Sequence, residues 1–286
     1  MTIQKLFKAG AILMIAALVT VTACKRSDKS TATNTGLTNA DDNGGYASDN
    51  AKLEQNNNDV ISIADAASQP SGASNLRTTS TYPTITLVDA GTDTVMTIDF
   101  GPTDHLCLDG RYRKGQVIVT YSGHYKDSGS IHTITTNNYY VNDQQVIAHK
   151  TVQNMGTNSH GQVWYNVTVN DSIILATDSV ISWTGNRTRT WDSGYSTTTR
   201  LDDVYLIGGT TTLKRANGHV FTFDIAASDP LKVAVDCPYI EAGTVTVSST
   251  VFTTGSRTVN YTYGGGGCDD LAQVTIGSTT YDITLH

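Results

Sequence analysis

Residues 116–121, Gln-Val-Ile-Val-Thr-Tyr, and residues 164–169, Trp-Tyr-Asn-Val-Thr-Val, carry the clearest structural signal in this chain. In the second stretch apolar and polar residues alternate, which is the two-residue period of a strand with one buried face. Both stretches consist largely of β-branched and aromatic residues, which pack well on a pleated sheet. These two segments are therefore predicted to be β-strands.

Similar runs continue from residue 84 to the C-terminus and are separated by turn dipeptides such as Asp109-Gly110 and Asn217-Gly218. The other predicted strands span residues 84–88, 95–100, 220–225, 244–247, 258–263, 273–276 and 281–285. No window of a dozen residues after position 84 has a helical period. The sequence predicts an all-β domain over residues 81–286, an antiparallel meander forming a sandwich or a barrel-like closure.

The composition of the 286 residues supports this fold class. Of 26 acidic residues only Glu54 and Glu241 are glutamate, and the remaining 24 (26 − 2) are aspartate, which favours turns over helices. Helical bundles and doubly wound α/β folds are therefore not expected. The formal net charge of −7 argues against nucleic acid as a partner.

Two segments of the chain resemble each other. Residues 121–123 and residues 127–129 are echoed by residues 183–185 and 192–194. This likeness is explained either by an internal duplication of a β unit or by chance in a chain rich in Thr and Gly.

Residues 1–23 have the parts of a bacterial export signal. Lys5 and Lys8 precede an apolar stretch over residues 9–21, which is shorter than the roughly 20 residues that a membrane span needs. The stretch ends in Val-Thr-Ala-Cys at residues 21–24, which resembles the lipobox of bacterial lipoproteins. We therefore predict a signal peptide and a lipid (palmitate) anchor on Cys24. The alternatives are an ordinary cleavage site with a chance cysteine, or a buried N-terminal helix.

The residues after Cys24 indicate where the protein is located. Lys25 stands where bacterial lipoproteins retained at the inner membrane often have aspartate, so an outer-membrane location is favoured, with the periplasmic or surface face left open. Residues 24–80 are rich in Ser, Thr, Asn and Asp, which predicts a flexible, lipid-anchored linker. Within it, residues 59–64 are either a brief helix or a docking strand.

Three cysteines remain in the mature chain besides Cys24. We favour a disulfide between Cys237 and Cys268, which would contribute roughly 3–4 kcal/mol by shortening the unfolded loop. The alternatives are a Cys107–Cys268 bond, or three reduced and buried thiols.

A series of short motifs resembles an uncharacterised lipoprotein family of Bacteroidota envelopes. The motifs are Cys-x-Asp-Gly-Arg-x-Arg-x-Gly at residues 107–115, Asn-Tyr-Tyr-Val-Asn at 138–142, and the segments 151–156, 187–191 and 267–269. They occur in order over about residues 84–286. The resemblance implies an exported β domain on a lipid anchor and carries no assigned activity.

Asp109, Arg111 and Arg113 form the first candidate site. Asp109 begins a turn, and the two arginines alternate onto one face of the strand that leaves it. That face would bind an acidic ligand or form structural ion pairs, and we favour the ion pairs. The acidic partners considered are Asp104, Asp269 and Asp270.

A second candidate site consists of Arg187, Arg189 and Trp191, which alternate on one strand face, with Trp183 and Tyr195 nearby. Exposed aromatic rings beside guanidinium groups are typical of sugar binding. Cross-strand aromatic and cation–π packing explains the same pattern and is favoured.

No motif predicts a catalytic, metal or cofactor site. The histidines lack ligand spacing, and nucleophile-elbow and P-loop patterns are absent from the sequence. Glu241 alone in the predicted β domain excludes a pair of catalytic glutamates, although aspartate pairs stay possible.

The favoured function is a non-enzymatic envelope module, held to the outer membrane by its lipid, that binds a glycan, an envelope protein or another partner. Two alternatives remain open. One is a glycan-acting enzyme or glycan-binding protein that uses aspartates near Trp183 and Trp191. The other is a lipid carrier with an apolar β cavity.

Overall fold

A computed structural model describes residues 37, 44–69, 76, 81–175 and 177–285, which belong to one compact unit. These residues form helix α1 (Gly45–Ser68) and 17 strands. The predicted signal peptide and Cys24 lie outside the described residues. The strands are β1 (Thr84–Asp89), β2 (Thr94–Asp99), β3 (His105–Leu106), β4 (Tyr112–Tyr121), β5 (Ile131–Val141), β6 (Gln144–Ile147), β7 (His149–Thr157), β8 (Val163–Ile174), β9 (Val180–Ser193), β10 (Val204–Arg215), β11 (Val220–Ile225), β12 (Leu231–Ala234), β13 (Ile240–Ala242), β14 (Thr244–Ser249), β15 (Arg257–Asn260), β16 (Leu271–Ile276) and β17 (Thr279–Thr284).

All pairings between the described strands are antiparallel. The main path runs β1-β2-β4-β5-β7-β8-β9-β10-β11-β14-β15-β16-β17, which places β1 and β17 at its two ends. Strand β3 adds to β4, β6 lies against β5 and β8, and β12 and β13 extend from β10. The predicted all-β antiparallel meander is confirmed.

The alternation along the strands creates one buried sheet face. In β8, Tyr165, Val167 and Val169 are buried, whereas Asn166 and Thr168 between them are more accessible. Hydrophobic side chains at the corresponding positions of the other strands continue this core. The sequence period therefore sets which side chains face inward.

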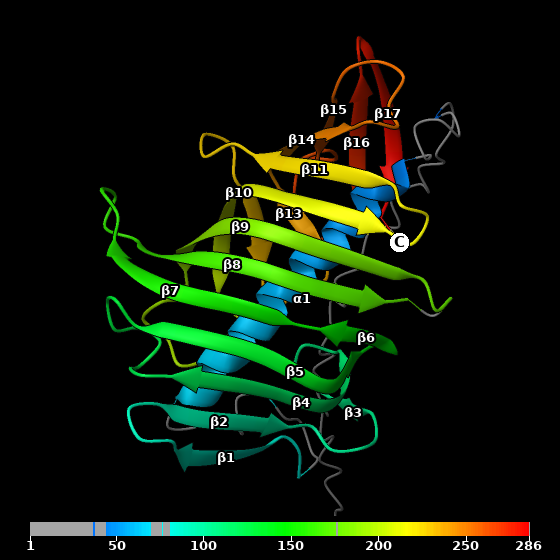
Figure 1. Cartoon of the computed structure of the whole chain (residues 1–286). Coiled ribbons are helices and arrows are strands. Elements are labelled where there is room, and N and C mark those ends of the chain that lie inside the picture. Colours follow the sequence, from blue (N-terminus) through cyan, green and yellow to red (C-terminus); the bar gives the residue numbers. More distant parts are fainter. Residues whose placement is uncertain (1–36, 38–43, 70–75, 77–80, 176, 286) are drawn as a thin grey trace, which may run out of the picture. The chain divides into compact units, whose positions relative to one another are not determined.

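Helix α1 covers this inner face and runs across the strands (Figure 1). Of its 24 residues 19 are buried, although many of them are Asn, Asp or other polar residues. The linker prediction was wrong for residues 45–68, and the segment 59–64 is part of this longer helix. The polar composition predicted a linker instead of a buried helix, because the partners of these polar side chains come from strands that are distant in the sequence. No helix in the described part of the chain is long and apolar enough to cross a membrane.

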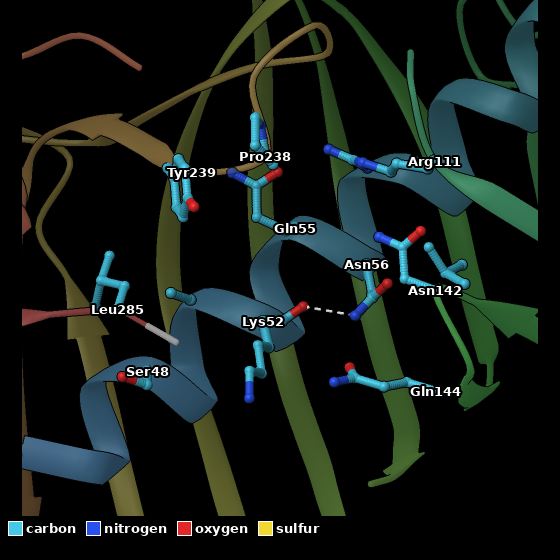
Figure 2. A pocket seen from close by; sticks show the side chains of 12 residues that line it. Ser48, Lys52, Gln55, Asn56, Arg111, Asn142, Gln144, Pro238, Tyr239 and Leu285 are labelled. Carbon is cyan, nitrogen blue, oxygen red and sulfur yellow. Dashed lines mark hydrogen bonds between the residues drawn. The ribbon is translucent and has the colours of Figure 1, made fainter. Parts of the chain in front are cut away.

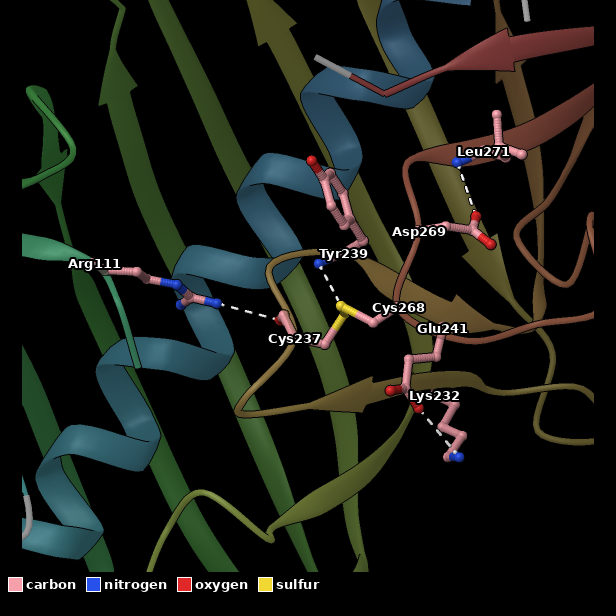
Figure 3. The surroundings of a disulfide bond; sticks show 8 residues. All are labelled: Arg111, Lys232, Cys237, Tyr239, Glu241, Cys268, Asp269 and Leu271. Atoms are coloured by element: carbon pink, nitrogen blue, oxygen red, sulfur yellow. Dashed lines mark hydrogen bonds and ion pairs between the residues drawn. A yellow bond between two sulfur atoms is a disulfide. The ribbon is translucent and has the colours of Figure 1, made fainter. Parts of the chain in front are cut away.

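The disulfide between Cys237 and Cys268 is confirmed, with 5.6 Å between the two Cα atoms. It links the β12–β13 connection to the β15–β16 connection (Figure 3). Cys107 is a buried free cysteine, so the alternative Cys107–Cys268 bond was wrong.

The two segments that resemble each other occupy different places. Residues 121–123 lie at the end of β4, whereas residues 183–185 lie in the interior of β9. The duplication hypothesis therefore gains no support from strand position and stays a prediction.

Candidate functional site

Cations on the sheet meet carboxylates on helix α1, and the first such group surrounds Arg113. The Arg113 guanidinium donates hydrogen bonds to both oxygens of Asp59 (2.7 and 3.3 Å) and both oxygens of Asp109 (2.7 and 2.6 Å). Arg111 Nη1 lies 3.2 Å from Asp59 Oδ1. The arginines of this first candidate site form structural ion pairs, but their partners are Asp59 and Asp109 rather than the Asp104, Asp269 or Asp270 considered from the sequence.

Arg200, from the β9–β10 connection, completes this group. Its Nη2 donates to Asp109 Oδ2 at 2.6 Å, and its Nη1 lies 3.5 Å from Asp59 Oδ1. We call these five residues (Asp59, Asp109, Arg111, Arg113 and Arg200) the Arg–Asp cluster. Burial opposes ionisation of Asp109, but the guanidinium groups of Arg113 and Arg200 hold its pKa well below the usual range. Lys114 pairs with Asp104 outside the cluster, at 3.2 Å.

The next ion pair along the helix joins Glu54 to Arg187 of β9. Arg187 Nη2 and Nε donate to Glu54 Oε1 at 2.5 and 2.8 Å, and both side chains are fully buried. Arg187 also donates to Thr211 Oγ1 at 2.6 Å and to the Gly209 carbonyl. A buried charge without such partners would strongly destabilise the fold, so this pair fixes how the helix docks.

Arg189 contacts the same helix through hydrogen bonds to neutral side chains. It donates to Asn58 Oδ1 (3.1 Å), Ser62 Oγ (2.9 Å) and the Tyr125 hydroxyl (3.0 Å). Its guanidinium lies 3.2 Å from the centroid of the Tyr205 ring. Arg189 is therefore a helix-docking residue with a cation–π contact.

Lys150 of β7 and Arg215 of β10 also contact helix α1. Lys150 Nζ lies 2.7 Å from Asp171 Oδ2 and donates to Asn57 Oδ1 at 2.8 Å. Arg215 Nη2 lies 2.5 Å from Asp49 Oδ2. Cations from β4, β7, β9 and β10 thus hold the helix along most of its length.

The tryptophans of the second candidate site are packing residues. Trp183 is fully buried beneath the Arg187 guanidinium (5.5 Å), and Trp191 Nε1 donates to Asp203 Oδ1 at 3.2 Å. Tyr195 is exposed and meets the Trp191 ring edge-on. The hypothesis of an exposed sugar-binding face on Trp183 and Trp191 was wrong, and the favoured packing interpretation is confirmed.

A small crevice lies beside Trp191, between Asp65 of the helix and Asp203. Burial raises the pKa of both carboxyl groups to about 6. The cavity volume is about 10 Å³, which is barely one water molecule and leaves no room for a sugar ring. This pair of carboxyl groups therefore does not favour the glycan-acting alternative.

A larger cavity, of about 170 Å³, opens along the other side of helix α1 (Figure 2). Eight of its twelve lining residues have polar side chains, four of them carboxamides, although most of the accessible lining surface is apolar; we call it the amide pocket. It is lined by Ser48, Ala51, Lys52, Gln55, Asn56, Arg111, Val141, Asn142, Gln144, Pro238, Tyr239 and Leu285. Helix α1, the β5–β6 turn and the disulfide-bonded loop thus each contribute residues to the wall of the pocket.

Neighbouring groups hold several of these side chains in place. Asn142 Oδ1 accepts from the Tyr112 backbone N–H at 2.9 Å, and Asn56 Nδ2 donates to the Lys52 carbonyl at 2.9 Å. Arg111 Nη2 donates to the Cys237 carbonyl at 3.3 Å, which joins the Arg–Asp cluster to the loop that carries Tyr239 (Figure 3). The pocket is therefore built on ordered groups.

Sequence reasoning found only Arg111 among these lining residues. The linker predicted over residues 24–80 includes helix α1, so the sequence does not indicate that Lys52, Gln55 and Asn56 line a pocket. One signal was present: the carboxylates at positions 49, 54, 59 and 65 recur every five or six residues, and strands with alternating arginines were available to face them.

Comparisons with protein families, with curated proteins and with solved structures find no match to this chain. In the parts of the chain that the structure describes, no group of three or more His, Cys, Asp or Glu side chains is arranged to hold a metal ion.

Proposed function

We propose that this protein is a lipid-anchored envelope module of the bacterial outer membrane that binds a small ligand in the amide pocket and does not catalyse a reaction. The lipobox-like segment ending at Cys24 supports the anchor. The pocket supports a ligand-binding role, because it is a concave site whose polar groups converge from three elements.

The side chains that line the pocket favour ligand binding over catalysis. Its polar groups are carboxamides, hydroxyls, one lysine and one arginine. General acid–base catalysis works best with a group whose pKa lies near the operating pH, which an amide or a guanidinium does not supply, so Lys52 and Tyr239 are the only described lining residues of a type that could act in this way. Amide and guanidinium groups orient a ligand through hydrogen bonds.

The lipid carrier is less well supported than a polar-ligand module. The inner face of the sheet, where an acyl chain would lie, is covered by helix α1 and its ion pairs. Acyl chains require an apolar lining, whereas these contacts are charged.

The anchor is tested by mass spectrometry of the mature protein from a bacterial host, combined with palmitate labelling. We expect a mature chain that begins at Cys24 and carries acyl groups, and a Cys24→Ser variant without them. A mature wild-type chain with a bare Cys24 thiol would overturn the envelope placement.

The non-catalytic role is tested on the purified protein with a panel of glycan, ester and peptide substrates. We expect no turnover. Turnover that is abolished by Gln55→Leu, with the fold retained by circular dichroism, would show that the pocket is an active site.

A further inference from the structure

We infer that the amide pocket takes a small organic carboxylate of about the size of one sugar or one amino-acid residue. This inference rests on the proposed function, since it names the ligand class of the same site. It follows from the charge beside the pocket, from an unpartnered amide in its wall and from its volume.

The Arg–Asp cluster carries surplus positive charge. Three guanidinium groups share two carboxylates, which gives 3 − 2 = +1. Of the cluster's three arginines, Arg200 lines the crevice beside Asp65 and Asp203, and Arg111 alone is among the residues that line the amide pocket. Since an uncompensated charge away from water is unfavourable, the cluster favours an additional anion nearby.

Arg111 is the member of the cluster that reaches the pocket wall, and Lys52 adds a second cation there. Glu54, two residues from Lys52, is paired with Arg187. Asp49, three residues away, is paired with Arg215 at 2.5 Å and also interacts with the charge of Lys52. Among the described residues that line the pocket, none has a carboxylate side chain. The pocket wall is therefore cationic in a protein whose formal net charge is −7.

Gln55 shows where a ligand oxygen would bind. Its side chain is 8% exposed, and its Nε2 has no hydrogen-bond partner in the described part of the chain. Figure 2 shows this amide between Pro238 and Tyr239, at the wall of the pocket. A buried N–H donor without an acceptor is unfavourable, and a turn of the Gln55 amide toward the pocket would let a carboxylate oxygen accept from it.

The volume of the pocket and its other lining residues indicate the size of the ligand and the groups that it carries beside the carboxylate. The volume of about 170 Å³ is below the range for drug-sized ligands, which favours a smaller ligand. Asn56, Asn142 and Gln144 offer amide donors and acceptors that suit hydroxyl or amide groups. A uronic acid and an N-acylated amino acid both carry a carboxylate with such groups attached.

The test is isothermal titration of the full-length purified protein with sodium glucuronate, N-acetylglycine and glucose. We expect at least one carboxylate to bind tenfold or more tightly than glucose, the neutral sugar. Binding of glucuronate alone identifies an acidic sugar as the source, binding of N-acetylglycine alone identifies an amino acid, and binding of both identifies the carboxylate itself. Binding of both carboxylates no tighter than that of glucose, or no binding of either carboxylate, would overturn the inference.

Variants then locate the site. Lys52→Met and Gln55→Leu are each expected to weaken carboxylate binding tenfold or more, with circular dichroism confirming the fold. Lys232→Met is the matched control: Lys232 pairs with Glu241 on β13 and does not line the pocket, so binding should be unchanged. Carboxylate binding that neither pocket variant weakens would place the site elsewhere and contradict the inference.

The inferred ligand class and the proposed envelope function can be refuted independently of each other. A lipidated, catalytically inactive protein that binds no carboxylate refutes the ligand class alone. A bare Cys24 thiol refutes the envelope placement, whatever binds in the pocket.

Discussion

Replacing Arg187 with methionine tests whether ion pairs hold helix α1 against the sheet. The guanidinium lies 2.5 Å from Glu54 Oε1, and neither side chain is exposed. Removing one partner of a buried pair leaves the other charge uncompensated, which typically destabilises a protein by about 3–5 kcal/mol. We therefore expect Arg187→Met to lower the free energy of unfolding by about that amount at pH 7.

The effect should depend on pH and on the partner. Burial raises the pKa of Glu54 even though Arg187 and Lys150 oppose the shift, so loss of Arg187 favours protonation of Glu54 still more. The stability difference between wild type and variant should then shrink as the pH is lowered. The double variant Arg187→Met/Glu54→Leu removes both charges and should be less destabilised than Arg187→Met, because apolar replacements of a buried pair are often tolerated.

The assay is urea unfolding followed by tryptophan fluorescence, since Trp183 lies 5.5 Å from the Arg187 guanidinium. The control is Lys232→Met, which breaks a more accessible pair with Glu241 (3.1 Å) and should lower stability by less than about 1 kcal/mol. An Arg187→Met loss no larger than that of the control would show that the helix does not depend on this pair. A double variant less stable than Arg187→Met would contradict the buried-charge argument.

Three further predictions concern the helix, one carboxyl group and the cysteines. Deleting residues 45–68 should leave a protein without cooperative unfolding in urea, because the cations of the sheet lose their partners; a folded, cooperative deletion variant would contradict this. Burial raises the pKa of Asp65 to about 6, so the native state retains a proton that the unfolded chain releases above pH 4, and stability falls as the pH rises from 4 to 6. Asp65→Asn should therefore gain up to about 3 kcal/mol at pH 8 and nothing below pH 4, and an equal gain at both pH values would refute this cause. Cys237→Ser should cost roughly 3–4 kcal/mol, and in the wild-type mature domain Cys107 should react with a thiol reagent only after unfolding; rapid labelling of the native protein would contradict its burial.

The strands that could be read from the sequence are those with a regular apolar alternation. The expected strand over residues 220–225 coincides with β11, and that over residues 164–169 lies within β8. Strands β5, β7 and β10 were not singled out, because polar residues interrupt their pattern, as Asn137 and Asn138 do in β5. The positions of β5, β7 and β10 in the sheet are determined by their pairing with neighbouring strands.

The sequence also predicted that Arg111 and Arg113 share a face and form ion pairs, because a strand places alternate residues on the same side. It could not predict their partner Asp59, which lies more than fifty residues away on an element assigned to the linker. Cysteine pairing was narrowed to two candidate bonds, and the folded positions of Cys237 and Cys268 selected between them.

Strand character and the inward-facing positions are thus local properties, because they follow from the two-residue period of each strand. The short turns between strands favour antiparallel order. Helix α1 and the amide pocket depend on the tertiary structure. Asn and Asp residues disfavour a helix in isolation, and the charges of the helix carboxylates are compensated by cations that only the assembled sheet brings to them. The same assembly places Gln55, Asn142 and Tyr239 around one cavity, although they are distant in the chain.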